Sequence, residues 1–362
     1  MFNPSRFRLA RRRRGFSKTR LAEGSGLELR TIYGYESGQW EPPPETLRRL
    51  ADALTFPAEF FFGEDIDQPS AQAASFRSMS RMSAAKRDMA LGAGAIAYLL
   101  NDWIERRFEL PTVDVPDLRG PGPESAAAAL RQHWGLGERP VRNMIHLLEA
   151  KGVRVFSLAE DSTDIDAFSL WRGSTPFMFL NTLKSAEHGR FDAGHELGHL
   201  VLHRHGAPSG QEAEREANAF ASAFLMPRAS VLAVSPGVST VEHLVHLKKQ
   251  WIVSVAALAY RLRTLGMISD WHYRTLCIEI QQRGYRQREP EGAQRESSQM
   301  LGKVFSTLRD EGVTKTDIAR ELSVPVDEID RLIFGLILMG LSSGQSTAPR
   351  PIPRRPTLKL IE

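Results

Sequence analysis

The stretch that most constrains the fold of this 362-residue chain runs from Arg190 to His203 and contains the pattern His-Glu-x-x-His. Its members are His195, Glu196 and His199. Residues four apart in a helix lie on one face, so the two imidazoles can reach a single cation. Glu196 lies about 100° further round and can reach a water molecule beside that cation. The pattern predicts a helix with two metal ligands and a general base; a buried amphipathic helix is the alternative.

A catalytic zinc ion takes three protein ligands and keeps one position open, so a third ligand is needed. The best candidate is Glu214, in a second predicted helix. His205 has the ten-residue spacing of a longer zinc motif, but that motif has glycine where this chain has Leu202. Glu216 is the rival carboxylate and lies about 160° round the helix from Glu214.

The neighbours of Glu214 support its choice. Ala217, one turn later, is small enough to let the two helices approach closely. Asn218, four residues after Glu214, can brace a ligand histidine from behind. We therefore expect Zn²⁺ to be held by His195, His199 and Glu214.

At these residues the chain resembles the ImmA/IrrE family of metallopeptidases. The resemblance rests on Arg190-Phe191, on the HELGH pentapeptide and on the run EREANAFASAFLMP. Upstream, Asp166–Ser169 and Pro176–Asn181 resemble strands of that family. Gly194 departs from the usual alanine, which costs about 1 kcal/mol of helix propensity and leaves every ligand in place. The resemblance implies a thermolysin-like site layout and cleavage of repressor proteins bound to DNA.

Three short segments are predicted as strands from their alternation and their β-branched or aromatic content: 153–158, 167–171 and 177–180. The third comes shortly before the metal helix, and we expect it at the edge of the sheet. An edge strand offers amide groups that can hold an extended peptide. Phe179, Leu180 and Asn181 are therefore expected to dock the substrate, with a plain core strand as the alternative.

Composition indicates an ordinary globular chain, with 42% hydrophobic and 25% charged residues. A single cysteine, Cys277, excludes an internal disulfide framework and fits a reducing compartment. The basic N-terminus has no apolar core after it, and the longest apolar run, Met89–Leu100, is too short to span a bilayer. We expect a cytoplasmic protein with no membrane contact.

Positive charge gathers near the N-terminus, although the net charge is only +4. Between Arg6 and Arg20 the chain carries basic residues and no acidic residue. This predicts contacts with nucleic-acid phosphates, and a solvated charge run is the alternative. The expected contacts are four consecutive arginines: Arg11, Arg12, Arg13 and Arg14.

The patterns Ser17-Lys18-x-x-Leu21-Ala22 and Tyr35-Glu36-x-Gly38 resemble the lambda-repressor-like (XRE-type) helix-turn-helix family. The resemblance implies that a helix from Glu28 to Glu36 lies in the major groove. Its outward positions are the candidates for base contact: Glu28, Arg30, Thr31 and Gly34. Lys18 stands where the family usually has glutamine and would contact phosphate. A protein-docking module of the same fold is the alternative.

Together these features predict a multidomain, mainly α-helical chain. An all-α helix-turn-helix domain precedes an α+β zincin-like (gluzincin) peptidase domain and a helical C-terminal region. The expected bounds are 1–63 for the first domain, 64–118 for a helical connector, 119–235 for the peptidase domain, 236–342 for the helical region and 343–362 for a disordered tail.

The two resemblances imply a DNA-binding transcriptional regulator with a zinc-dependent endopeptidase domain. Glu196 would take a proton from water and deliver it to the leaving amine. The expected partners are a double-stranded DNA operator and a protein substrate such as a repressor, and a homodimer on a palindromic operator is consistent with the module. The alternative is a transcription factor whose peptidase-like domain senses a metal, a ligand or a stress without proteolysis. The intact Glu196 favours the peptidase.

Overall fold

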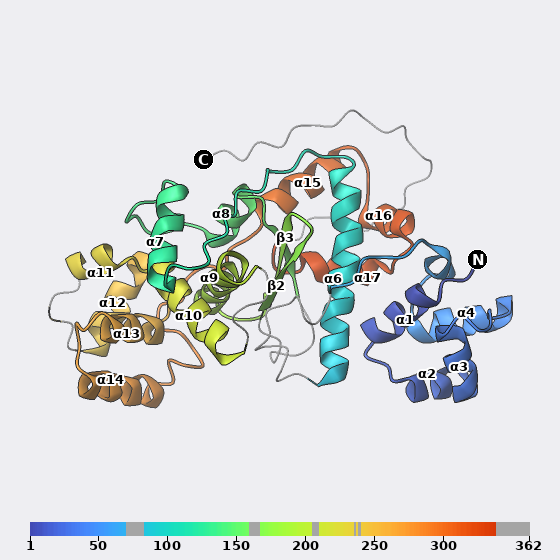
Figure 1. The fold of residues 1–362 in the computed structure, drawn as a ribbon, viewed down its shortest axis with the longest axis horizontal. Coiled ribbons are helices and arrows are strands. Elements are labelled where there is room, and N and C mark those ends of the chain that lie inside the picture. The colour runs from blue at the N-terminus through green and yellow to red at the C-terminus, as the bar shows by residue number, and fades with distance from the viewer. Residues whose placement is uncertain (70–82, 159–166, 205–209, 235–236, 238–239, 338–362) are drawn as a thin grey trace.

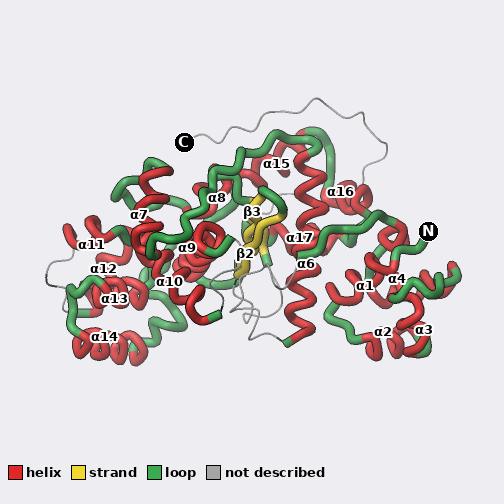
Figure 2. The backbone as a smooth tube through the Cα atoms, in the orientation of Figure 1, coloured by secondary structure: helices red, strands yellow, loops and turns green. Residues whose placement is uncertain are grey.

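The computed structural model describes residues 1–69, 83–158, 167–204, 210–234, 237 and 240–337. Over these residues the chain is mainly helical and contains one small three-stranded sheet (Figures 1 and 2). The predicted fold class is confirmed. The predicted tail at 343–362 lies outside the described residues.

The N-terminal module consists of α1 (Pro4–Arg13), α2 (Lys18–Ser25), α3 (Leu29–Glu36), α4 (Pro44–Leu54) and a 3₁₀ turn, η1 (Ala58–Phe62). Asn3 caps α1, and the Ser17 hydroxyl caps α2 by accepting from the Arg20 amide at 3.0 Å. Gly26 adopts the left-handed conformation that ends α2. The helices share a fully buried apolar core that includes Phe7, Leu21, Ile32, Leu50 and Phe60.

The long helix α6 (Ala84–Glu105) lies between this module and the sheet (Figure 1). On one side it packs against α1, where a Cβ added at Gly92 would be 3.1 Å from the Arg13 Cα. On the other side the rings of Tyr98 and Phe177 meet edge to face, with centroids 4.6 Å apart. The segment expected to be a connector thus belongs to the packed core.

The sheet contains β1 (Arg154–Ser157), β2 (Ala167–Arg172) and β3 (Thr175–Leu180), near the three predicted strands. Its order is β1-β3-β2, with β3 parallel to β1 and antiparallel to β2. The prediction that β3 is an edge strand is therefore wrong. Its residues pair on both sides, since Phe179 faces Phe156 in one neighbour and Phe168 in the other.

Four more helices surround the ligand cluster and the sheet: α7 (Pro123–His133), α8 (Met144–Ala150), α9 (Ala186–Leu202) and α10 (Gln211–Leu225). Helix α9 lies on β2 and β3 and makes its most extensive contact with α10. Helix α9 begins at the Ser185 cap, whose hydroxyl accepts from the His188 amide. The sheet and α10 therefore hold the predicted metal helix from two sides.

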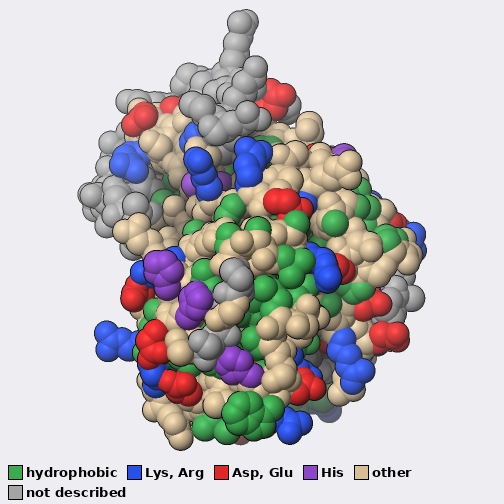
Figure 3. Space-filling model, turned by 90° about the vertical axis from the view of Figure 1, so that its left-hand side faces the viewer, with side chains coloured by type: hydrophobic (Ala, Val, Ile, Leu, Met, Phe, Trp, Pro, Cys, Tyr) green, Lys and Arg blue, Asp and Glu red, His purple; other side chains and the backbone are tan. Residues whose placement is uncertain are grey.

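Four further helices form one end of the molecule: α11 (Arg228–Val234), α12 (Val241–Trp251), α13 (Val255–Thr264) and α14 (Asp270–Gln282). Figure 3 views the molecule from this end and shows scattered acidic, basic and histidine side chains around a partly apolar centre. Among the described residues no single helix is long and apolar enough to cross a membrane; α10 and α11, bent by 55°, pass that test only as a pair.

The last helices return to the middle of the molecule: α15 (Gln299–Asp310), α16 (Lys315–Leu322) and α17 (Val326–Ile333). Helix α15 packs on α8, whereas α17 packs on α6 and β1. Thr314 and Asp317 form a reciprocal capping box that starts α16. The helices after residue 236 therefore lie in two separate places: α12 to α14 are at one end of the molecule and α15 to α17 are in its middle (Figure 1).

Candidate metal centre and helix-turn-helix surface

Close packing of α9 on α10 places the metal-binding side chains together. A Cβ added at Gly198 would lie 3.1 Å from the Ala217 Cα, so the two backbones nearly touch there. Ala217 is fully buried at this contact. His195 and His199 from α9 and Glu214 from α10 then converge between the helices.

The ligand atoms lie close to the spacing of a tetrahedral zinc site. The Nε2 atoms of His195 and His199 are 3.0 Å apart, and each lies 3.3 Å from one carboxylate oxygen of Glu214. Ligand atoms at the usual zinc distances in a tetrahedron are about 3.3–3.4 Å apart. Two imidazole nitrogens and one carboxylate oxygen are also a typical catalytic donor set. The residues therefore fit a zinc ion.

The charges of the three ligands are coupled. Burial works to raise the pKa of Glu214, but hydrogen bonds and charge from His195 and His199 hold it well below its usual range. Burial works to lower the pKa of His195, yet Glu214, Glu196 and Asn218 together raise it. The carboxylate is thus kept ionised, as a metal ligand must be.

Each ligand histidine has a partner behind it. The Nδ1 of His195 is 3.1 Å from the Asn218 Oδ1, where the sequence placed a bracing group. The Nδ1 of His199 is 3.0 Å from the Nδ1 of His203, whose Nε2 is 2.9 Å from the Glu216 Oε2. Glu216 therefore pairs with His203 and stands apart from the ligands. His205 lies outside the described residues.

The expected base, Glu196, is held from the sheet. Its carboxylate Oε2 accepts a hydrogen bond of 2.7 Å from the hydroxyl of Ser169 on β2. The same hydroxyl lies 3.1 Å from the Glu196 carbonyl oxygen, and both residues are buried. Sequence reasoning gave Ser169 no role, because nothing in the pattern shows which strand residue faces the helix.

The expected docking residues are inside the protein. Phe179, Leu180 and Asn181 are at most 3% exposed. The Asn181 Oδ1 accepts from the Leu183 amide at 3.0 Å and so shapes the turn before α9. Their position in a central strand removes the reason for assigning them to peptide binding.

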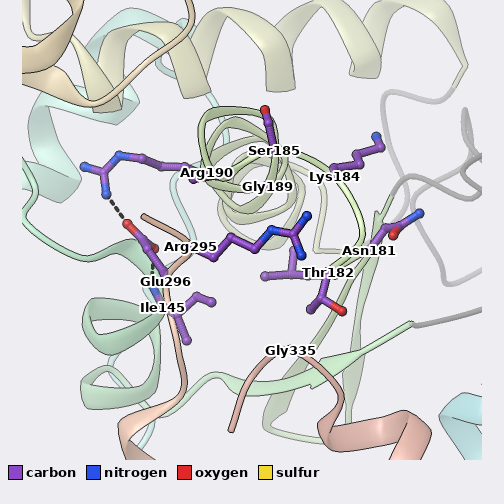
Figure 4. Close-up of a pocket in the computed structure, with 12 residues that line it drawn as sticks. Ile145, Asn181, Thr182, Lys184, Ser185, Gly189, Arg190, Arg295, Glu296 and Gly335 are labelled. Carbon is purple, nitrogen blue, oxygen red and sulfur yellow. Dashed lines mark hydrogen bonds and ion pairs between the residues drawn. The ribbon is translucent and has the colours of Figure 1, made fainter. Parts of the chain in front are cut away.

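A small pocket of about 40 Å³ lies at the start of α9 (Figure 4). Thr182, Lys184 and Arg295 are among its lining residues. Arg190 extends away from the labelled Ser185 and Lys184 to form an ion pair with Glu296 (Figure 4). Arg190 also donates to the Val141 carbonyl, so its guanidinium joins α9 to neighbouring segments.

On the helix-turn-helix module, Glu28 and Arg30 are exposed and Thr31 is half-buried. The Lys18 ammonium lies 3.7 Å from the centre of the Tyr33 ring and 3.2 Å from the Glu36 carboxylate. The charge of Lys18 is thus shared with groups of α3.

Gly34 is not at the surface, contrary to expectation. A Cβ added there would lie 2.2 Å from a Trp40 ring carbon, so the indole covers this face of α3. Trp40 is itself 39% exposed, and Tyr33 on the same helix is 53% exposed. The exposed part of α3 therefore combines polar and aromatic side chains, and base contact by Gly34 is excluded by the indole.

The four consecutive arginines mostly face the protein. The Arg11 Nε lies 2.6 Å from Glu36, while Arg13 and Arg14 each lie 2.7 Å from one oxygen of Glu328 in α17. Arg11 and Arg13 are buried. The prediction of a phosphate-binding arginine run fails for these three residues, because their charges are paired with carboxylates of α3 and α17.

Arg12 differs from its neighbours. It is paired with Asp88 of α6 at 3.6 Å, and both side chains are partly exposed, at 43% and 36%. Of the four arginines it has the weakest ion pair. Its side chain is also the most exposed of the four.

Comparison with known families agrees with both parts of this description. Residues 148–263 match the family model of the IrrE N-terminal-like domain, a peptidase family, and residues 5–59 match a helix-turn-helix domain. The first match contains the ligand cluster, and the second covers α1 to α4 from the second residue of α1 onward. No curated protein matches the chain. Both predicted resemblances are confirmed.

Proposed function

Because the chain joins a helix-turn-helix domain to an IrrE N-terminal-like, metallopeptidase-like domain, we propose that it is a DNA-binding regulator with zinc-dependent endopeptidase activity. One observation carries the proposal. The Nε2 atoms of His195 and His199 lie 3.0 Å apart and each is 3.3 Å from a carboxylate oxygen of Glu214, on two helices that pack in direct contact. Zinc bound there supplies a Lewis acid at the scissile carbonyl.

Glu196 is the proposed general base. It follows His195 directly in α9 and is 3% exposed. The Ser169 hydroxyl holds one carboxylate oxygen at 2.7 Å and so limits the rotation of the side chain. In the proposed reaction this carboxylate accepts a proton from the attacking water and returns it to the amine that leaves.

For DNA binding, we propose that α3 enters the major groove. Arg30 and Thr31 then contact bases, with Glu28 beside them at the start of the helix, and Lys18 contacts phosphate. The exposed ring of Tyr33 lies beside the Lys18 ammonium, and the ring of Trp40 lies beside the Arg30 guanidinium. The proposed partners are a double-stranded operator and a protein substrate such as a repressor, with two copies of the chain on a palindromic site.

A non-proteolytic sensor is the second candidate function, because such a protein would use the same metal ligands. It would have no need of a base. The buried placement of Glu196, fixed by Ser169, favours the peptidase.

Glu196→Gln separates the two candidate functions. The amide has nearly the same shape but cannot take a proton, so the variant should bind zinc normally and cut no peptide. The test incubates the zinc-loaded full chain with a peptide library and identifies new termini by mass spectrometry. Cleavage by the wild type and none by Glu196→Gln is expected. Equal cleavage by both proteins rejects the mechanism, whereas no cleavage by zinc-loaded wild type favours the sensor.

A further inference from the structure

We propose that His203 and Glu216 form a hydrogen-bonded chain that positions His199 as a metal ligand. The inference rests on the proposed zinc site and adds two positioning residues to it. His203 is the C-cap residue of α9, one turn beyond His199, and Glu216 lies on α10 two residues after Glu214.

The chain is continuous and largely sheltered from solvent. The Nδ1 atoms of His199 and His203 are 3.0 Å apart, and the His203 Nε2 lies 2.9 Å from the Glu216 Oε2. The side chain of His203 is 7% exposed, whereas that of Glu216 is 35% exposed. The chain therefore runs from the ligand cluster to a carboxylate near the surface.

One arrangement of protons satisfies every contact. The Nε2 of His199 points at His195 and Glu214, so a cation there requires its lone pair. The proton of a neutral His199 then sits on Nδ1 and is donated to His203. His203 accepts through Nδ1, so its own proton sits on Nε2 and is donated to Glu216. The direction of the whole chain follows from metal binding by His199.

The other ligand histidine, His195, has a single hydrogen-bond partner in place of the two-residue chain. The Nδ1 of His195 lies 3.1 Å from the side-chain amide oxygen, Oδ1, of Asn218. Both imidazoles thus find an acceptor for the proton on the nitrogen remote from the metal. Only the chain behind His199 ends in a carboxylate, which makes that ligand the more strongly polarised of the two.

The register of the two helices explains why two of the three acidic residues of α10 are used. Glu214 reaches the ligand cluster, and Glu216, on a different face, reaches His203 at the end of α9. A purely structural ion pair between the helices would have the same distances. It would not require the Nδ1 contact between His199 and His203, and it would not influence metal affinity beyond any effect on folding.

The test measures zinc affinity of the full chain by competition with a chelating dye, together with urea unfolding of the zinc-free protein. His203→Phe removes the acceptor, whereas His203→Asn and Glu216→Gln keep oxygen acceptors. We expect His203→Phe and Glu216→Ala to bind zinc about 10–100-fold more weakly, with substantial rescue in His203→Asn and Glu216→Gln. His188→Ala is the matched control, since His188 lies in α9 about two turns before His195 and its Nδ1 contacts the Ser185 hydroxyl at 2.9 Å.

Three outcomes are decisive. Weaker zinc binding in His203→Phe, with rescue by His203→Asn, supports the chain. Wild-type zinc affinity in His203→Phe, or a loss that follows stability alone and is not rescued by His203→Asn, overturns it. Failure of the wild type to bind zinc would instead reject the proposed function on which the inference rests.

Discussion

Two glycines on the same face of α9 should respond oppositely to alanine. A Cβ at Gly198 would lie 3.1 Å from both the Ala217 Cα and a Phe220 ring carbon. A Cβ at Gly194 would meet Ala221 and Leu225 atoms only at 3.4–3.6 Å, which is ordinary van der Waals contact. The first substitution therefore presses on the backbone of α10, and the second fills available space.

The expected magnitudes follow from these contacts. Replacing glycine by alanine inside a helix gains about 1 kcal/mol. At Gly198 this gain is opposed by overpacking, which typically costs about 1–3 kcal/mol. Gly194→Ala should therefore be more stable than the wild type by about 1 kcal/mol, and Gly198→Ala should lie about 1–3 kcal/mol below Gly194→Ala. Because Glu214 lies one turn before Ala217, a shift of α10 should also weaken zinc binding in Gly198→Ala alone.

Urea unfolding of the zinc-free chain and a chelator competition for zinc measure both effects. Equal stabilisation by the two substitutions, together with wild-type zinc affinity in Gly198→Ala, would refute the close contact of α9 with α10. It would also remove the reason why a ligand from α10 can reach the histidines.

Three further predictions concern other parts of the molecule. Glu328→Ala should destabilise the chain by about 3–5 kcal/mol in thermal or urea unfolding, because it leaves the buried Arg13 without its carboxylate. As a control, Asp88→Ala breaks the partly exposed ion pair with Arg12 and should change stability by less than about 1 kcal/mol. Arg30→Ala should weaken binding of the full chain to its preferred DNA by about 1–3 kcal/mol in gel-shift titrations, and no wild-type binding to a random-sequence pool at low salt would count against a DNA-reading surface. Burial raises the pKa of Glu149 from its ordinary 4.5 to about 7, so its contribution to stability is complete below about pH 4.5 and is lost as the pH rises through about 7. Glu149→Gln should flatten the pH dependence of the unfolding free energy across that range, and an unchanged slope would contradict this.

Local patterns allowed much of the helical structure to be predicted. Helix α8 occupies residues 144–150 as expected, and Ser17 caps α2 as expected. The two histidines of the ligand cluster could also be predicted from the sequence, because their spacing alone places His195 and His199 on one face of a helix. Each of these features depends on residues that are near one another in the sequence.

Features that depend on distant segments were missed. The strand β3 was placed at the edge because it precedes α9, but its pairing with β1 depends on a segment that the local pattern does not link to it. The arginines of α1 were expected at the DNA surface, whereas the partner of Arg13 is 315 residues away. Charge is visible in a sequence, but the group that neutralises it is not.

The proposed positioning residues, His203 and Glu216, also depend on the packing of separate helices. The spacing of His203 after His199 was visible, but its role depends on how far α10 is shifted along α9. The same register decides that Glu214, and not Glu216, meets the two ligand histidines.

Metal analysis of the full-length chain and its variants decides whether His195, His199 and Glu214 form a zinc site. After saturation with zinc and removal of excess metal, the wild type should retain about one zinc per chain. His199→Ala should retain none, Glu214→Ala should retain little, and Glu216→Ala should still load under saturating zinc. Full occupancy at wild-type affinity in Glu214→Ala, with loss of zinc in Glu216→Ala, would contradict this ligand set.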